Sequence, residues 1–122
     1  MIKVIVIGAG GRMGRMLVTG ISQDNDLELA GAIESPDVPF LGKDAGELAG
    51  LSSLDIPIVD DSHLADLFSK ADVAVNFITP KEAVLKHLQI AVDSKKPMVI
   101  GTTGFTAEEE EKIKEYNKLM SY

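Results

Sequence analysis

The sequence predicts an α/β fold in which a parallel sheet carries helices on both faces. Three observations support this prediction. Apolar runs of strand length alternate with segments of helical periodicity along the chain. A glycine-rich turn at residues 8–14 joins the first strand pattern to the first helix pattern. Repeated strand–helix–strand units give parallel strands with right-handed crossovers, so we expect a doubly wound sheet in the order 3-2-1-4-5.

The length and composition fit one globular domain. The chain has 122 residues, of which 45% are hydrophobic and 25% are charged, a balance typical of a folded domain. A net charge of −7 argues against nucleic acid or an anionic membrane as a partner, because both are bound through clustered Lys and Arg. The chain has no cysteine and no apolar run of membrane-spanning length, so we expect a cytoplasmic protein.

The first unit consists of a strand, a turn and a helix. Residues 2–7 read Ile-Lys-Val-Ile-Val-Ile, a largely β-branched run of strand length. The helical pattern covers residues 12–22, and Met16, Leu17 and Ile21 form its expected buried stripe. The glycine turn should therefore lie between a strand end and a helix N-terminus.

The next segment predicts a strand followed by a long loop. The strand is expected over residues 27–33, with Glu34 at its C-terminal end. Prolines, glycines and alanines interrupt the pattern over residues 35–54, which indicates a loop with one helical turn near residues 45–48. Loops of this length in a small domain are usually functional or mobile. A third strand is expected over residues 56–59.

The remaining elements repeat the alternation of helix and strand. A short helix, a fourth strand over residues 73–77, a capped helix, a fifth strand over residues 98–100 and a last helix follow in turn. The short helix has cap candidates Asp60, Asp61 and Ser62 and apolar residues Leu64, Leu67 and Phe68. Capping boxes at Thr79 with Glu82, and at Thr106 with Glu109, open the last two helices, and Val84, Leu85, Leu88 and Ala91 or Val92 should face the sheet.

The glycine turn is a candidate phosphate site. A turn that opens a helix presents backbone N–H groups at the positive end of the helix dipole, which suits a pyrophosphate. The spacing departs from the common G-x-G-x-x-G fingerprint, because Met13 stands at the place of the third glycine; the chain has Gly8, Gly11 and Gly14, with Gly10 in addition. The alternative is a tight turn that binds no ligand.

Glu34 supports a dinucleotide site. It lies 20 residues after Gly14, at the end of the predicted second strand, where a carboxylate can accept hydrogen bonds from the adenine ribose hydroxyls. The same carboxylate would repel a 2′-phosphate, which favours NAD over NADP. The alternative is an exposed acid at the start of a loop. In doubly wound sheets the ligand lies at the carboxyl ends of the strands, where the glycine turn, Glu34 and residues 77–79 and 101–104 should converge.

Other polar residues give weaker signals. Arg12 could lie beside a pyrophosphate or point to solvent, and Thr102 and Thr103 suit a nicotinamide amide or a substrate carboxylate, or else simply form a turn. His63 and His87 fall in predicted helices without a partner acid, so we interpret them as surface or packing residues. We find no catalytic nucleophile with an adjacent base and no metal cluster, and we predict no catalytic or metal-binding residue in this chain.

Three stretches carry a resemblance to a known family. They are Gly-Ala-Gly-Gly-Arg-Met-Gly at 8–14, Gly-Lys-Asp-Ala-Gly-Glu-Leu-Ala-Gly at 42–50 and Val-Ile-Gly-Thr-Thr-Gly-Phe at 99–105. With them the chain resembles the Rossmann-like N-terminal domain of the dihydrodipicolinate reductases over essentially its whole length. The resemblance implies cofactor contacts by Gly8, Ala9, Gly10, Gly11, Arg12, Met13, Glu34, Phe77, Gly101, Thr102 and Thr103, with Thr103 also near the substrate carboxylate.

The resemblance also implies a function. The family reduces an unsaturated cyclic dicarboxylate with NAD(P)H in lysine and diaminopimelate biosynthesis, and its C-terminal domain carries the catalytic motif and the interface of a homo-oligomer. Residues 1–122 would then form the dinucleotide-binding domain alone, which binds cofactor without catalysis. We expect NADH, with NADPH as the alternative, because Ser35 replaces an arginine that several members place after the ribose-binding acid.

The chain also departs from the family's pattern at the end of the fourth predicted strand. The family's Asp-Phe-Thr or Asp-Phe-Ser is Asn76-Phe77-Ile78 here, so the local hydrogen bonding should differ. The competing hypothesis is a free-standing nucleotide-binding or redox-sensing module that catalyses nothing.

Overall fold

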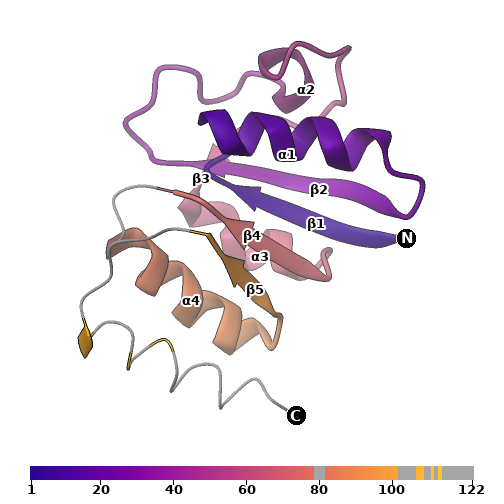
Figure 1. Ribbon diagram of the computed structural model, residues 1–122. Coiled ribbons are helices and arrows are strands. Elements are labelled where there is room, and N and C mark those ends of the chain that lie inside the picture. The colour runs from indigo at the N-terminus through magenta and orange to yellow at the C-terminus, as the bar shows by residue number, and fades with distance from the viewer. Residues whose placement is uncertain (79–81, 102–106, 109–110, 112, 114–122) are drawn as a thin grey trace.

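The computed structural model confirms the predicted sheet. It describes residues 1–78, 82–101, 107, 108, 111 and 113. Five strands form one sheet in the order β3-β2-β1-β4-β5, and every adjacent pair is parallel (Figure 1). The strands are β1 (Ile2–Ile7), β2 (Leu27–Glu34), β3 (Ile58–Asp60), β4 (Val73–Asn76) and β5 (Met98–Ile100).

Helices cover both faces of the sheet (Figure 1). On one face lie α1 (Arg12–Gln23) and α2 (Ala45–Leu48); on the other lie α3 (Leu64–Phe68) and α4 (Glu82–Ser94). A short 3₁₀ turn, η1 (Asp61–His63), leads into α3. No helix in the described residues is long and apolar enough to span a bilayer.

The central strand β1 divides the hydrophobic core into two layers. Because successive side chains of a strand point to opposite faces, Ile5 and Ile7 pack toward α3 and α4, whereas Val4 and Val6 pack toward α1 and α2. All four are buried. Burial on both faces explains why the strand reads as an almost continuous apolar run, and it fixes the position of the turn that follows.

The buried stripe of α1 differs from the prediction. Met16 is 63% exposed, and the buried residues of this helix are Gly14, Val18 and Ile21. The reason is the close approach of Gly14 to the preceding turn, which sets the rotation of the helix about its axis. Residues one and two turns further along, at the i+4 and i+7 positions, then face the sheet. Apolar character alone did not reveal this rotation.

The predicted long loop is organised by one carboxylate. Asp44 accepts backbone N–H groups from Glu47 at 2.9 Å, Leu54 at 3.0 Å and Ile56 at 2.9 Å. Partial burial raises the pKa of Asp44, but these bonds outweigh it and hold the pKa below its usual range. Since the Ile56 N–H is taken by Asp44, β3 begins at Ile58 and not at residue 56 as predicted.

Replacing Asp44 by alanine should destabilise the protein by about 2 kcal/mol, because three backbone donors lose a charged acceptor at once. The midpoint of urea unfolding measures the effect. Asp37→Ala is the matched control, since Asp37 is an exposed acid of the same segment and no side-chain hydrogen bond is found for it among the described residues. An equal change in the two variants would show that Asp44 does not organise the segment.

β4 ends at Asn76, so Phe77 lies just beyond the strand rather than at its last position. The helical turn expected near residues 45–48 is confirmed as α2. The predicted caps at Thr79, Thr106 and Glu109 lie outside the described residues.

Candidate functional site

The carboxyl ends of the central strands meet at the glycine turn. The Gly8 N–H donates to the Ile33 carbonyl at 2.8 Å, which joins the turn to the end of β2. The Phe77 N–H donates to the Ile7 carbonyl at 2.9 Å, which joins the end of β4 to β1. The Gly101 N–H donates to the Asn76 carbonyl at 2.9 Å and brings in the end of β5. The structure therefore places these four chain segments at one edge of the sheet, as the sequence predicted.

At two positions of the turn, the backbone itself requires glycine. Gly8 has φ of +92°, a left-handed conformation that side chains rarely adopt. A Cβ on Gly14 would lie 1.9 Å from the Gly8 carbonyl oxygen, far inside van der Waals contact. These two residues let the first turn of α1 pack directly on the end of β1.

The backbone N–H groups of the turn fall into two sets. Those of Gly8, Ala9, Gly10 and Gly11 donate within the protein, to Ile33, Glu34 or the turn itself. By contrast, the N–H groups of Arg12, Met13 and Gly14 donate to no acceptor among the described residues. These three groups lie in the first turn of a 12-residue helix, where unpaired donors and the helix dipole both favour an anion. Gly14 was not among the predicted cofactor contacts.

Glu34 lies beside the turn and is 7% exposed. Its Oε2 atom accepts the Gly10 N–H at 2.9 Å, and its Oε1 atom accepts the Ser35 N–H at 3.2 Å. The carboxylate thus connects the end of β2 to the glycine turn. Each carboxylate oxygen can accept more than one hydrogen bond, so this arrangement leaves capacity for a further donor.

A phenylalanine covers the turn on the Glu34 side. A Cβ on Gly10 would lie 2.3 Å from two atoms of the Phe40 ring and 3.2 Å from Glu34 Oε2. Only glycine lets this ring from the β2–α2 segment reach the turn. Sequence reasoning missed Phe40, because nothing in the pattern of an irregular segment shows which of its apolar residues folds back.

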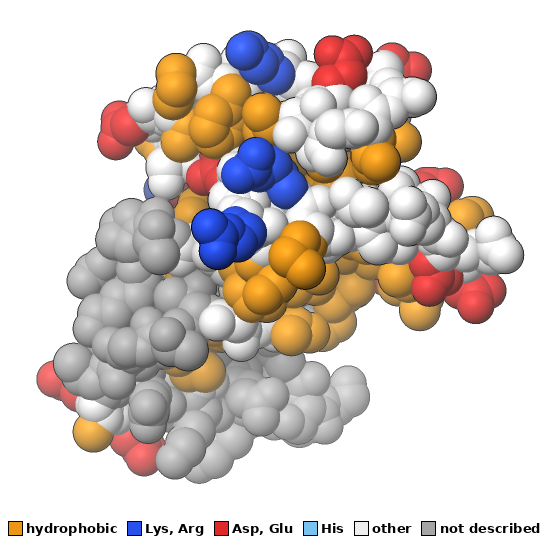
Figure 2. Space-filling model, turned by 45° about the horizontal axis from the view of Figure 1, so that its top comes forward, with side chains coloured by type: hydrophobic (Ala, Val, Ile, Leu, Met, Phe, Trp, Pro, Cys, Tyr) orange, Lys and Arg blue, Asp and Glu red, His pale blue; other side chains and the backbone are white. Residues whose placement is uncertain are grey.

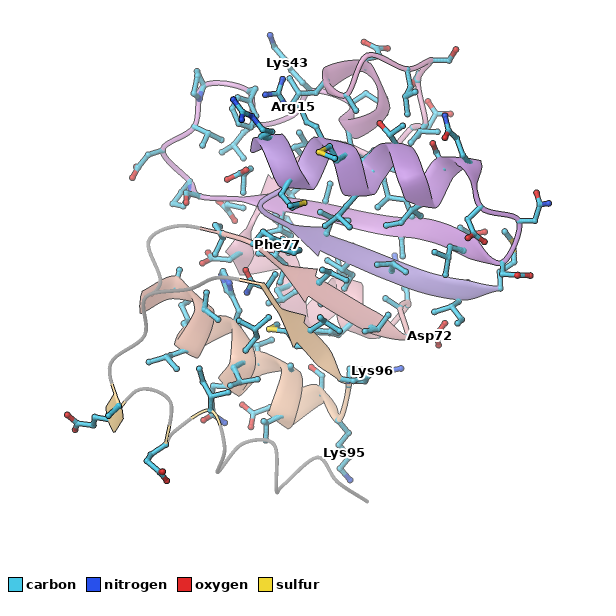
Figure 3. The ribbon with its side chains drawn as sticks, in the orientation of Figure 1. Arg15, Lys43, Asp72, Phe77, Lys95 and Lys96 are labelled. Atoms are coloured by element: carbon cyan, nitrogen blue, oxygen red, sulfur yellow. The ribbon has the colours of Figure 1, made fainter. Side chains whose placement is uncertain are left out.

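A second phenylalanine marks the opposite side of the site. Phe77 lies at the carboxyl end of β4 (Figure 3), and its ring packs against Gly101, where an added Cβ would lie 1.9 Å from the ring. The close approach explains the glycine at residue 101. The predicted contacts Thr102 and Thr103 lie outside the described residues.

Basic side chains surround the start of α1. Arg12, Arg15 and Lys43 are exposed, and Lys and Arg side chains gather on the face that carries α1 and α2 (Figure 2). Figure 3 shows Arg15 at the N-terminal end of α1 and Lys43 on the segment before α2. The Arg15 Nε atom donates to the Gly11 carbonyl at 3.4 Å. In a protein of net charge −7, this local positive surface is suited to an anionic ligand.

A groove lies next to this edge of the sheet rather than in it. It has a volume of about 600 Å³ and runs between α1 and α2. Its Arg12 end adjoins the glycine turn, but Glu34, Phe77 and Gly101 do not line it. The candidate site therefore lies at the strand ends, where Glu34, Phe77 and Gly101 meet the glycine turn. The described residues contain no group of three side chains suited to a metal ion.

One prediction about the histidines is wrong. His87 does have a partner acid: its Nε2 atom lies 3.1 Å from Asp61 Oδ2, and its side chain is fully buried. The two residues are 26 positions apart and come together because α4 packs against the segment of η1 and α3. No local sequence pattern contains that contact. His63 is exposed, as expected.

The order of the parallel strands and the glycine turn at the switch between β1 and β4 define a Rossmann-like α/β domain. Within that class the chain can be placed more narrowly. The chain belongs to the family described as "Dihydrodipicolinate reductase, N-terminus", whose model matches residues 2–122.

Named relatives agree with this placement. A protein of Geotalea daltonii named 4-hydroxy-tetrahydrodipicolinate reductase is 45% identical over 109 residues, which are 89% of this chain and 40% of the relative. A protein of the same name from Syntrophotalea carbinolica is 44% identical over 115 residues, which are 94% of this chain and 42% of the relative. The chain therefore spans about two fifths of the length of these relatives.

A solved structure shares the fold. Dipicolinate-bound dihydrodipicolinate reductase from Paenisporosarcina sp. TG-14 superposes with a TM-score of 0.68 at 24% identity. The match covers 98% of this chain and 43% of that one. At this level of identity the comparison supports the architecture and not the roles of individual residues.

Proposed function

We propose that this chain is the cofactor-binding part of a reductase that transfers a hydride from a nicotinamide dinucleotide to an unsaturated cyclic dicarboxylate in lysine and diaminopimelate biosynthesis. The observation that carries the proposal is the family match over residues 2–122, together with relatives named as 4-hydroxy-tetrahydrodipicolinate reductase. The bound nicotinamide would supply the hydride, while the protein orients it and excludes competing reactions.

The residues at the sheet edge fit a dinucleotide. The unpaired N–H groups of Arg12, Met13 and Gly14 would hold the pyrophosphate, with the Arg12 and Arg15 guanidinium groups supplying positive charge nearby. Glu34 would accept from the adenine ribose hydroxyls. On the opposite side, Phe77, Gly101, Thr102 and Thr103 would contact the nicotinamide, and Thr103 would also meet the substrate carboxylate.

We assign the catalytic groups and the homo-oligomer interface to a part of the enzyme that this chain does not match in its relatives, since each match covers only 40–42% of the relative. We also propose a cytoplasmic location, as for an enzyme of amino-acid biosynthesis that uses a soluble cofactor.

NADH is the proposed cofactor. A buried carboxylate at the end of β2 favours ribose hydroxyls and repels a 2′-phosphate, and the neighbouring Ser35 adds no positive charge. The exposed Lys43 and Arg15 provide some positive charge on this face, which leaves NADPH as the weaker alternative.

Glu34→Gln should change the cofactor preference. The wild-type protein should bind NADH more tightly than NADPH, and removing the charge should reduce that preference by about tenfold, because the carboxylate no longer repels the phosphate and accepts the ribose hydroxyls less strongly. Isothermal titration with each cofactor measures the four dissociation constants. Glu28→Gln, at the exposed start of the same strand, removes one charge away from the site and should alter neither affinity. Absence of NADH binding at millimolar concentration would contradict the proposed function; tighter binding of NADPH by the wild type would contradict the preference alone.

A further inference from the structure

Near the edge of the sheet where the strand ends meet lies a cluster of polar residues that the proposed function does not use. Asn76 and His87 are both fully buried, and Asp61 lies at the surface end of the cluster with a side chain 17% exposed. They come from β4, α4 and η1 respectively. Burying such groups is costly unless every donor and acceptor is paired, and no buried side-chain polar atom is unpaired among the described residues.

The hydrogen-bond directions in this cluster follow from one backbone group. The Ile78 N–H can only donate, so the Asn76 atom that lies 3.1 Å from it is the amide oxygen. The amide nitrogen of Asn76 then faces His87 Nδ1 at 3.1 Å and the Met98 sulfur at 3.6 Å. Because an amide nitrogen only donates, His87 Nδ1 must be an acceptor. The ring proton is therefore on Nε2, from which it is donated to Asp61 Oδ2 at 3.1 Å.

The cluster is hydrogen-bonded to the backbone just after β4. The Asn76 side chain holds the Ile78 N–H, and the Asn76 carbonyl accepts the Gly101 N–H at 2.9 Å. Phe77 lies between these two attachments, with its ring against Gly101. The backbone of Phe77 and Ile78 also passes 3.1 Å from the position of a Cβ on Gly8. A rotation of the Asn76 side chain would remove its hydrogen bond to the Ile78 N–H, next to both Phe77 and the turn at Gly8.

We propose that Asp61, His87 and Asn76 form a positioning relay, in which a neutral Nε2–H imidazole fixes the Asn76 amide and thereby places Phe77 for contact with the nicotinamide half of the cofactor. This inference rests on the proposed function. None of the three residues touches the cofactor in this arrangement; they act through Phe77 and the backbone that follows it.

The charges around His87 support the neutral form. In the described residues the charged groups that face it are Asp61 from η1 and Lys86 from its own helix, while β4 and β5 contribute the uncharged Asn76 and Met98. Burial lowers the pKa of His87 below its ordinary value of 6.5 and outweighs the opposing effect of Asp61. Burial raises the pKa of Asp61, but its bonds from His87 and Lys86 bring the pKa below the usual 3.8. At neutral pH the relay therefore contains a neutral imidazole and a carboxylate.

Protonation of His87 would break the relay. A proton on Nδ1 would face the hydrogens of the Asn76 amide, so donor would oppose donor. The folded protein resists this proton, whereas the unfolded chain accepts it near the ordinary pKa of 6.5. The stabilising contribution is therefore fully present above pH 6.5 and is lost as the pH falls toward the lowered pKa of the folded state.

Two variants test the relay with different chemistry. In His87→Gln, the glutamine side chain cannot make the hydrogen bonds to Asn76 and Asp61 that the imidazole makes. Asn76→Asp keeps the acceptor for Ile78 but removes the donor to Nδ1, so it should raise the pKa of His87 and make the relay depend on a protonated imidazole. His63→Gln is the matched control, because His63 is exposed and lies outside the cluster.

The experiment compares NADH with ADP-ribose, which lacks the nicotinamide. At about pH 8, both variants should bind NADH about 3- to 30-fold more weakly, whereas their affinity for ADP-ribose should not change. This difference is expected because the relay is coupled only to the nicotinamide half of the cofactor. The Asn76→Asp variant should recover NADH affinity as the pH is lowered, because a protonated His87 can donate to the new carboxylate. Nitrogen-15 spectra of the histidine rings should show the Nε2–H form for wild-type His87.

Each outcome separates the hypotheses. Equal weakening of both ligands would indicate a purely structural role, and unchanged NADH affinity would show that the cluster does not position Phe77; either result overturns the inference. The inference would also be overturned if wild-type His87 carried its proton on Nδ1, or were charged, at about pH 8. If the wild-type protein binds neither ligand, the proposed function fails and the inference fails with it. If His87→Gln does not fold, the isosteric Asn76→Asp variant carries the test.

Discussion

Gly14→Ala should destabilise the protein by about 3 kcal/mol or more and abolish tight cofactor binding. The added Cβ would lie 1.9 Å from the Gly8 carbonyl oxygen, 2.7 Å from the Gly8 carbonyl carbon and 2.8 Å from the Ala9 Cα atom. These are backbone atoms at the end of the central strand. Because no side chain can move to relieve the clash, the helix itself must shift. Overpacking of this kind commonly costs about 1–3 kcal/mol, and a rigid backbone neighbour places this site at or beyond the upper end.

The same helix provides the control for Gly14. A Cβ on Gly20 would meet nothing within 4 Å. Gly20→Ala should therefore stabilise the protein by about 0.5–1 kcal/mol through helix propensity alone. Chemical denaturation of both variants measures the difference, and titration with NADH measures the effect on the turn. A Gly14→Ala variant as stable as Gly20→Ala would show that the turn is not packed as described.

Gly101→Ala should weaken NADH binding by about tenfold while leaving ADP-ribose binding unchanged. The new methyl group would occupy the space of the Phe77 ring, with Phe77 Cε1 only 1.9 Å from the Cβ position. A side chain can move where a backbone cannot, so the effect on stability should be smaller than for Gly14. The displaced ring, however, is the one that we assign to the nicotinamide side of the site.

A double-mutant cycle shows whether the ring is responsible. In a Phe77→Ala background there is no ring to displace, so adding Gly101→Ala should change NADH affinity little further. If the two substitutions act additively, the loss comes from a direct effect at Gly101 and not from Phe77. If Gly101→Ala alone has no effect on NADH, Phe77 is not a cofactor contact.

The sequence predicted the fold well because both patterns that define it are local. Strand β1 is apolar on both faces and glycine follows it directly, so the central strand and the turn can be read from adjacent residues. The strand order follows from the right-handed crossover rule together with the switch point that a glycine turn marks. Element boundaries were less accurate where a side chain competes for a backbone donor, as Asp44 does for the Ile56 N–H.

The site was predicted only in part because some of its contacts are not local. The convergence of the glycine turn, Glu34 and Gly101 follows from the topology, since parallel strands bring their carboxyl ends to one edge. The position of Phe40 over Gly10 depends on how an irregular segment folds back, which no periodicity encodes. The pairing of Asp61 with His87 depends on the packing of two helical segments. The departure at Asn76 was visible in the sequence, but its hydrogen-bond partners were not.

The structure also refines which donors of the turn are available. The sequence suggested Gly8 to Met13 as pyrophosphate contacts, yet the Gly8 and Gly10 N–H groups already donate to Ile33 and Glu34. The donors that have no acceptor among the described residues therefore belong to the first turn of α1. This division of roles follows from hydrogen-bond geometry, which composition alone does not contain.

We propose that a nicotinamide dinucleotide binds across the strand ends, with its pyrophosphate at the first turn of α1. A titration of nitrogen-15-labelled protein with NADH, followed through the backbone amide signals, tests it most directly. We expect saturable shifts that are largest at Arg12, Met13 and Gly14, with smaller shifts at Ser35, Phe77 and Gly101. Shifts confined to the groove between α1 and α2, around Thr19, Gly20 and Leu48, or no shift at millimolar NADH, would contradict it.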